Sequence, residues 1–493
     1  MKRILVLLLF CFSVFVVSCS ESDGERTDSL AVDGSGIIQF TFFENSIDAS
    51  KKKDAYEIDG TKLTIKEAGY YCIRGKCSKG SITIPEETAN VRLEIQSLNL
   101  SCDYGAPLLC RKKSDVIVFL SGKSTLKDNE NPEDEYSEDE ARAREFKGAA
   151  IKVERCAKLM ICGDGALNVD AAACKDGIRG ESEAKVVIES GTVNVSADND
   201  GISSMGWLEI QDADVNVEAG GDGIKSDPAY VLDNIDKREA SFVGGTVKIK
   251  GGKVRVSAEG VAVKGASALE IGVKGSSSGP EIEIVKSRRG LEAAQLQLYS
   301  GTGAILSGED GISAAYERFT NTDESDGGYR YANDLYSAFK EKYGDFIAKI
   351  DGGTWTVDAQ ETGLKSGGSV VISGGSTTVF GGADSSNAAI YTETGFELRG
   401  GTIFGIGRAS MAEVPRAIPA GYSYYVCEPE HEQVIIHSGD ALVVKDSKGN
   451  AVASAVAPRD ASYVLYGLTE SGGLYRLFIN GVEYYHSGVL PNS

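Results

Sequence analysis

The chain has 493 residues, of which 42% are hydrophobic, 8% aromatic and 25% charged, a balance that is typical of a folded protein. Its 72 acidic and 51 basic residues give a formal net charge of −21. This charge argues against nucleic acid as a partner, and against any polyanion that a cation does not bridge. The three histidines are His431, His437 and His486, so a histidine-based zinc site or a histidine base is excluded from the chain before them.

The N-terminus has the pattern of an exported bacterial lipoprotein. Two basic residues precede an apolar stretch over residues 4–17, which is too short to span a bilayer. A serine and then Cys19 follow, and a polar tether comes next. We expect a signal peptide over residues 1–18, and the lipidated Cys19, the tether and an N-terminal cap over residues 19–54. The chain would then lie in the bacterial cell envelope, at the cell surface or in the periplasm. The alternative is an ordinary secretory signal with a chance cysteine.

Eight cysteines remain beyond Cys11 and Cys19, and seven of them fall between residues 72 and 174. They are Cys72, Cys77, Cys102, Cys110, Cys156, Cys162, Cys174 and Cys427. Export and an even count permit disulfides. Cysteine also fills a regular core as a small apolar residue, so both alternatives stay open. No Cys-x-x-Cys occurs, which argues against a thiol redox centre and a four-cysteine zinc site.

A short Asp-Gly-Ile turn recurs through the middle of the chain. Its copies begin at Asp176, Asp200, Asp222 and Asp310, and degenerate copies begin at Glu259, Arg289 and Thr362. Positions 178, 202 and 224 are 24 and 22 residues apart, and glycine-rich bends with alternating strands lie between the copies. Such short strands at this period predict a parallel β-helix, because each turn buries its inner face only by stacking on the next turn. A propeller, with repeats of about 40–45 residues, fits worse.

This reading predicts an all-β chain with one long domain. We place a single-stranded parallel β-helix over residues 55–410, with insertions at about 228–245 and 315–349. The second insertion has a partly helical pattern. Residues 411–493 lose the repeat and carry tyrosine-rich alternation and turns, which predicts a small antiparallel β-module that caps the last turn of the helix.

Stacked turns would place their aspartates in a column. Asp176, Asp200 and Asp222 would lie about one strand spacing apart, with Asp198 beside them. Carboxylates about 5 Å apart repel one another, and Ca²⁺ relieves that repulsion because it takes six to eight oxygen ligands. We therefore predict a Ca²⁺ site at these four residues. The alternative is an Asx-type turn, in which each aspartate caps its own corner by accepting a hydrogen bond from backbone N–H.

Basic residues follow the same turn. Arg179 and Lys225 come directly after its isoleucine, and Lys264 lies near the next copy. A basic strip beside an acidic column suits a uronate polymer, whose carboxylates would meet cations, and Trp207 could stack on a sugar ring. We predict that Arg179, Lys225, Lys264 and Trp207 bind carbohydrate. Charge pairing between neighbouring turns is the alternative.

Catalysis is a second possibility for the same face. β-Elimination from a uronate would use Ca²⁺ and a basic side chain, for which Lys225 and Lys264 are the candidates. The Gly-His-Gly and Arg-Ile-Lys motifs of β-helical pectin hydrolases do not occur. Non-catalytic polysaccharide binding is the first hypothesis, a Ca²⁺-dependent polysaccharide lyase the second, and an adhesin or structural surface protein the third.

The order of several motifs resembles a bacterial family of β-helical carbohydrate-binding domains, typified by a clostridial cellulose- and pectin-binding surface protein. The motifs that carry the resemblance are residues 58–65, 68–71, 80–84, 104–108, 149–151, 161–167, 176–179, 222–226 and 407–411. The resemblance implies a right-handed parallel β-helix, similar to that of some polysaccharide lyases. It also implies binding of acidic plant polysaccharide with Ca²⁺ and no established catalysis.

By position, the resemblance makes Asp176, Asp198, Asp200 and Asp222 the Ca²⁺ ligands, with Lys225 beside them. Glu259, Arg289 and Thr362 replace the aspartate in later copies of the turn, so the metal column would be confined to the middle turns. The expected partners are a polysaccharide and, through the lipid, a membrane, with no nucleic acid and a monomeric chain.

Overall fold

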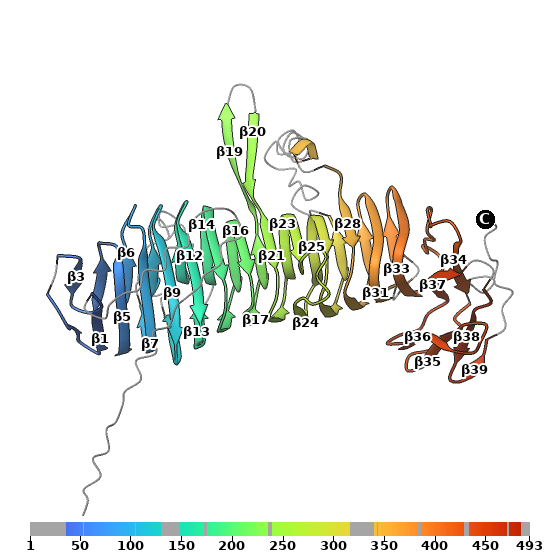
Figure 1. Cartoon of the computed structure of the whole chain (residues 1–493), viewed down its shortest axis with the longest axis horizontal. Helices are drawn as coiled ribbons and strands as arrows, with labels where there is room; N and C mark the ends of the chain where they lie inside the picture. The colour runs from blue at the N-terminus through green and yellow to red at the C-terminus, as the bar shows by residue number, and fades with distance from the viewer. Residues whose placement is uncertain are drawn as a thin grey trace, which may run out of the picture.

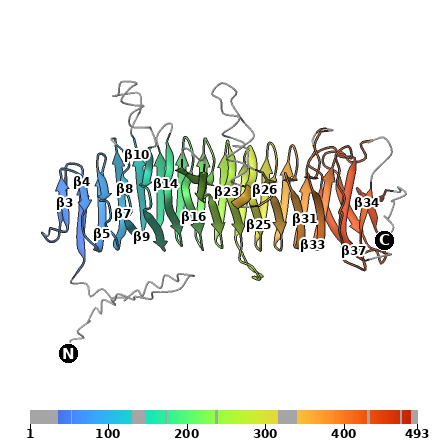
Figure 2. The ribbon, with the colours of Figure 1, turned by 90° about the horizontal axis from the view of Figure 1, so that it is seen from above.

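The computed structural model describes residues 36–52, 54–103, 105–129, 148–171, 175–234, 239–315, 340–342, 344–382, 384, 386–427, 433–470 and 473–484. These residues are nearly all in strands and turns, with one short helical segment at residues 340–342. The strands form an elongated stack that runs from the N-terminal to the C-terminal end (Figures 1 and 2). No helix in the described residues has both the length and the apolarity needed to cross a membrane. Cys19 and the predicted signal peptide lie outside the described residues.

Most strands pair in parallel with the strand one repeat further along the chain, and these pairings fall into three rows. Row A contains β4 (Lys62–Ile65), β6 (Ser81–Ile84), β8 (Leu108–Cys110), β11 (Ala149–Val153), the first parts of β14 (Asp176–Ile188) and β16 (Ile202–Ile210), β18 (Ile224–Ser226), the first parts of β23 (Val261–Ile271) and β25 (Arg289–Leu298), β27 (Ile312–Ala314), β30 (Leu364–Ser366) and β32 (Ile390–Thr392).

Row B follows row A along the chain. It contains β1 (Ile38–Phe43), β5 (Gly69–Cys77), the first part of β7 (Val91–Cys102), β9 (Asp115–Ser121), β12 (Lys158–Gly163), the later parts of β14 and β16, β21 (Thr246–Ile249), the later parts of β23 and β25, β28 (Ile347–Ile350), and the first parts of β31 (Ser369–Phe380) and β33 (Gly395–Gly407).

Row C completes each turn. It contains the later parts of β5 and β7, β10 (Lys123–Asp128), β13 (Ala166–Ala171), β15 (Thr192–Ala197), β17 (Asp214–Ala219), β22 (Lys253–Ala258), β24 (Glu281–Lys286), β26 (Thr302–Ser307), β29 (Thr354–Ala359) and the later parts of β31 and β33. From β11 to β33 the strands follow the order A, B, C along the chain, and this order repeats once in each turn.

The alternation of side chains explains why the rows enclose a core. In β15, Val193 and Val195 are buried while Asn194 between them faces outward. The outward asparagines also bind one another, because Nδ2 of Asn194 donates to Oδ1 of Asn168 and Nδ2 of Asn216 donates to Oδ1 of Asn194, both at 3.0 Å. Inward positions therefore set the register by burial, and outward positions are left to vary.

The two ends of the stack are covered by antiparallel strands. At the start, β2 (Ser46–Ala49) pairs antiparallel with β1, and β3 (Tyr56–Asp59) with β4. At the other end, β37 (Tyr463–Glu470) pairs antiparallel with β33 and with β34 (Tyr422–Cys427). A separate antiparallel sheet follows the order β36-β35-β38-β39. These strands are β35 (Ala441–Lys445), β36 (Ala451–Val456), β38 (Arg476–Ile479) and β39 (Val482–Glu483).

Two predicted boundaries differ from the structure. Parallel pairing begins at β1, where Ile38 is the partner of Tyr71, so the stack starts before residue 55. β28 already belongs to row B at Ile347, so the stack resumes inside the predicted insertion 315–349. The other insertion is a hairpin of β19 (Pro228–Asn234) and β20 (Glu239–Gly244), which projects from the stack (Figure 1).

No disulfide joins any two of the seven cysteines in the described ranges. Six of these seven are buried, and Cys156 is partly exposed. Their burial agrees with the apolar-filler alternative rather than with disulfides. Cys174 lies outside the described residues.

Candidate functional site

The Asp-Gly-Ile turns build a ladder of hydrogen bonds along row A. The backbone N–H of Asp200 donates to Oδ1 of Asp176 at 3.2 Å, and that of Asp222 donates to Oδ1 of Asp200 at 2.9 Å. The N–H of Val261 continues the ladder to Oδ1 of Asp222 at 2.8 Å. Each carboxylate thus accepts from the backbone of the next turn. The alternative expected from the sequence was a carboxylate that caps its own turn, so the hydrogen bond is present but its donor belongs to a different turn.

The glycine of the turn is required because successive turns approach closely. A Cβ on Gly201 would lie 2.2 Å from Cγ1 of Val217 and 2.6 Å from the carbonyl oxygen of Gly223. The isoleucine that follows, Ile202, is fully buried. The three-residue motif therefore combines a carboxylate acceptor, a close backbone approach and an inward apolar side chain.

One degenerate copy of the turn was predicted in the wrong register. Val263, not Val261, is the partner of Ile224, so Val261 occupies the aspartate position and the copy does not begin at Glu259. The physical reason is burial: Val263 is fully buried at the isoleucine position. The partners of Leu291, Ile312 and Leu364 agree with the predicted copies at Arg289, Asp310 and Thr362.

The predicted cations lie in one line, at the outward position after the buried isoleucine. Arg179 pairs in register with Ser203, Ser203 with Lys225, and Lys225 with Lys264. We call these four residues the row A strip. On one side Lys152 extends the line, and on the other Glu292 interrupts it. The strip is therefore confined to the middle turns of the stack.

Every cation of the strip is paired with a carboxylate. Nη1 of Arg179 lies 2.6 Å from Oδ2 of Asp176. Nζ of Lys225 lies 2.7 Å from Oδ2 of Asp200 and 3.4 Å from Oδ2 of Asp222. The Lys225–Asp200 pair joins neighbouring turns, as the charge-pairing alternative expects. These pairs hold the cations in fixed positions.

Two cations of the strip lie further out than a carboxylate with which they pair. The Arg179 side chain is 18% exposed and that of Asp176 only 1%, while the values for Lys225 and Asp200 are 21% and 7%. Lys365 and Asp310, further along row A, show the same order at 37% and 3%. At Arg179 and Lys225 the strip therefore presents positive groups over more deeply buried carboxylates, whereas Lys264 is 14% exposed and its partner Asp227 18%.

The carboxylates keep Lys225 charged. Burial alone lowers the pKa of Lys225, but the charges of Asp200, Asp227 and Asp222 outweigh it and raise the pKa above the ordinary lysine value. The pKa of Asp200 is raised, because burial and the charge of Asp176 oppose its ionisation more than Lys225 favours it. Lys225 therefore stays protonated and positively charged at neutral pH.

In this arrangement, donors of the protein itself occupy the oxygens of Asp176, one of the predicted Ca²⁺ ligands. Oδ1 of Asp176 accepts from Nδ2 of Asn199 at 2.7 Å as well as from the Asp200 N–H, and its Oδ2 accepts from Oγ of Ser203 at 2.8 Å and from Arg179. Asp198 is exposed and is not one of the acceptors in the ladder. Within the described ranges, no group of three or more His, Cys, Asp or Glu side chains could hold a metal ion.

Trp207 lies apart from the strip, although it belongs to the same strand as Ser203. It is 40% exposed and lies in row B, where its partners are Lys185 and Thr246. The structure therefore brings Arg179, Lys225 and Lys264 together but not Trp207.

Asp227 was not predicted as part of the site. Its Oδ1 lies 3.6 Å from Nζ of Lys264 and its Oδ2 lies 3.8 Å from Nζ of Lys225. It directly precedes β19 and so joins the strip to the base of the hairpin. The signal available in the sequence was an acidic residue between Lys225 and the start of an insertion.

Comparison with known proteins defines the class of the chain. A family model described as a carbohydrate-binding domain-containing protein matches residues 59–385, and the chain belongs to this family. Among solved structures, the chain is similar to a polysaccharide lyase-like protein from C. thermocellum, in a gadolinium derivative. The identity is 20%, the match covers 53% of this chain and 96% of that chain, and the TM-score is 0.42. No curated protein matches the chain.

Proposed function

We propose that the chain binds an acidic, pectin-like polysaccharide through the row A strip and does not cleave it. The observation that carries this proposal is the order of charges, with Arg179 and Lys225 outward over more deeply buried carboxylates. Membership of a carbohydrate-binding family supports a sugar ligand. A guanidinium and two ammonium groups in register suit the carboxylates and hydroxyls of successive sugar units, because Arg binds carboxylate through two N–H groups and Lys binds it as a point charge.

Binding is favoured over elimination because Lys225 is a poor base. A general base works best when its pKa lies near the operating pH. The raised pKa of Lys225 keeps it protonated, and Lys264 faces Asp227. Both lysines therefore suit ligand binding and charge neutralisation better than proton abstraction.

The proposal assigns the sugar contacts to side chains rather than to a metal. The oxygens of Asp176 and Asp200 already accept hydrogen bonds and ion pairs. Ca²⁺ assistance, which the sequence predicted, is not part of this proposal, and removal of Ca²⁺ tests the difference directly.

The proposal also includes the finer architecture and the location. The repeated A, B, C order of the rows supports a single-stranded parallel β-helix with the strip along one of its faces, and the family resemblance implies that it is right-handed. The lipid on Cys19 would hold this monomeric helix at the surface of the bacterial envelope, facing polysaccharide outside the cell.

The test is a calorimetric titration of the protein with polygalacturonate, with Ca²⁺ and then with EDTA, while absorbance reports unsaturated uronate products. We expect heat in both buffers and no absorbance change. Arg179→Gln should weaken binding about tenfold, whereas Lys253→Gln, which removes an exposed cation from row C, should not. Rising absorbance would identify a lyase, and absence of heat would remove this ligand class.

A further inference from the structure

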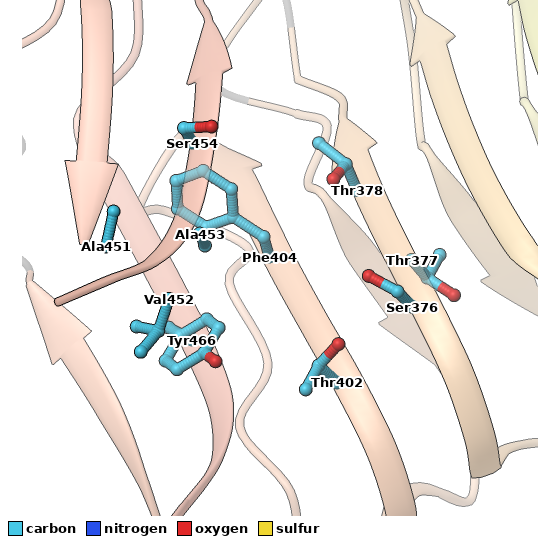
Figure 3. Close-up of a pocket in the computed structure, with 10 residues that line it drawn as sticks. All are labelled: Ser376, Thr377, Thr378, Thr402, Phe404, Ala451, Val452, Ala453, Ser454 and Tyr466. Atoms are coloured by element: carbon cyan, nitrogen blue, oxygen red, sulfur yellow. The ribbon is translucent and has the colours of Figure 1, made fainter. Parts of the chain in front are cut away.

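A groove lies at the C-terminal end of the stack, where row C meets the C-terminal strands. Its volume is about 270 Å³, just below the range of about 300–1,000 Å³ that is usual for small-molecule pockets. Outward side chains of β31 and β33 line one side, and residues of β36 with Tyr466 of β37 line the other (Figure 3). The residues from β33, β36 and β37 lie beyond the segment that matches the carbohydrate-binding family.

The groove is uncharged in a strongly acidic protein. No acidic or basic side chain is among the described residues that line it. Four of the lining side chains carry aliphatic hydroxyls that face outward or toward the groove, namely Ser376, Thr378, Thr402 and Ser454. A ligand with hydroxyl groups and no charge matches such a lining, because each hydroxyl both donates and accepts a hydrogen bond.

The hydroxyls continue from the groove along row C. Thr402 pairs in register with Ser376, Ser376 with Thr354, and Thr354 with Thr302. Thr302, Thr354 and Ser376 are exposed and Thr402 is partly exposed. Strands of a sheet are about 4.7–4.9 Å apart, so these hydroxyls form an evenly spaced track that leads out of the groove.

Apolar surface accompanies the hydroxyls. Phe404 and Tyr466 meet edge to face with ring centroids 6.4 Å apart and form the buried end of the groove. Val452, which is 37% exposed, stands on β36 beside them. Sugar rings present C–H groups between their hydroxyls, and small binding sites combine apolar lining with a few polar groups that orient the ligand.

We propose that this groove and the hydroxyl track form a second binding site, which takes an uncharged oligosaccharide segment. The site does not rest on the function proposed for the row A strip, since it uses no charged residue and lies mostly outside the family-matched segment. The chain would then hold polysaccharide at two chemically different places on one rigid stack.

The test measures binding of neutral hexaoses of glucose, mannose and xylose to the full chain by calorimetry. At least one should bind, and the double variant Thr378→Val/Thr402→Val, which keeps side-chain shape, should weaken that binding about tenfold. Ser454→Trp, on the exposed edge strand β36, should block the groove. Thr192→Val, an outward threonine of row C far from the groove, is the matched control and should have no effect.

Polygalacturonate binding separates the two sites, because it should be unchanged in the groove variants. Absence of binding by all three hexaoses would overturn the proposal. So would hexaose binding that survives both the double variant and Ser454→Trp. An extended peptide that binds the wild type and is lost in Ser454→Trp, without any sugar binding, would assign the groove to peptide and also reject it as a sugar site.

Discussion

The row A strip and the row C groove are built on the same backbone but differ in every outward property. The strip holds Arg179, Lys225 and Lys264, each fixed by a carboxylate. The groove is lined by hydroxyls such as Ser376 and Thr402, and none of the described residues that line it is charged. Since buried residues set the register in both regions, outward residues can change from turn to turn without changing the fold. The buried residues therefore determine the fold, and the outward residues determine which ligand the surface can bind.

Row C shows this change within a single line of positions. Asp214 pairs in register with Lys253, and Lys253 with Glu281, but the next position is Thr302. The Lys253–Glu281 ion pair is 68% and 62% exposed at 3.5 Å. Such exposed pairs contribute about 0–1 kcal/mol. The Lys253–Glu281 pair therefore contributes little to stability, whereas the pairs of the row A strip are part of its structure.

The largest expected effect is on the free energy of unfolding. Lys225→Met should lower it by about 2–4 kcal/mol, because Asp200 and Asp222 would lose their cation in a mostly buried site. Lys253→Met, the exposed counterpart on row C, should cost less than about 1 kcal/mol. Denaturant unfolding of both variants measures the difference. Equal losses would refute the distinction between the two rows.

A smaller effect should follow when the C-terminal module loses its tether to the stack. Nη1 of Arg459 donates to the carbonyl oxygen of Ala359 at 2.8 Å, and its other nitrogen meets Asp358. Arg459→Ala should destabilise the module by about 1.5–3 kcal/mol and raise amide exchange in β36. Binding of neutral oligosaccharide should fall while polygalacturonate binding holds. Loss of both would mean that the two sites are not separate.

The smallest expected effect is that of pH on the strip. Because the folded-state pKa of Lys225 is raised, its stabilising charge is fully present below its unfolded pKa of about 10.4 and is lost only above that value. Polygalacturonate affinity should therefore change less than about twofold between about pH 6 and pH 9. A steep fall across this range, measured by titration at each pH, would show that Lys225 titrates there.

The repeat allowed much of this arrangement to be predicted from the sequence. The regular period placed Asp176, Asp200 and Asp222 in one column and Arg179 and Lys225 in one line, as the strand registers confirm. The same period gave the wrong register at Val261, because the insertion before β21 lengthens that repeat and Val263 takes the isoleucine position instead.

Other features depend on contacts that no repeat encodes. The use of the aspartate oxygens by backbone N–H groups of the next turn follows from the stacking geometry. Asp227 occurs once, at the foot of a hairpin. The groove needs Ser376 and Ser454 to meet through the packing of a module that lacks the repeat.

The most direct test of the central claim is a crystal structure of the protein with an oligogalacturonate. The account predicts sugar carboxylates on Arg179, Lys225 and Lys264, with the Asp200–Lys225 ion pair intact and no bond of the sugar broken. Sugar held by a Ca²⁺ ion on Asp176, Asp200 and Asp222, with Lys225 displaced, would contradict it.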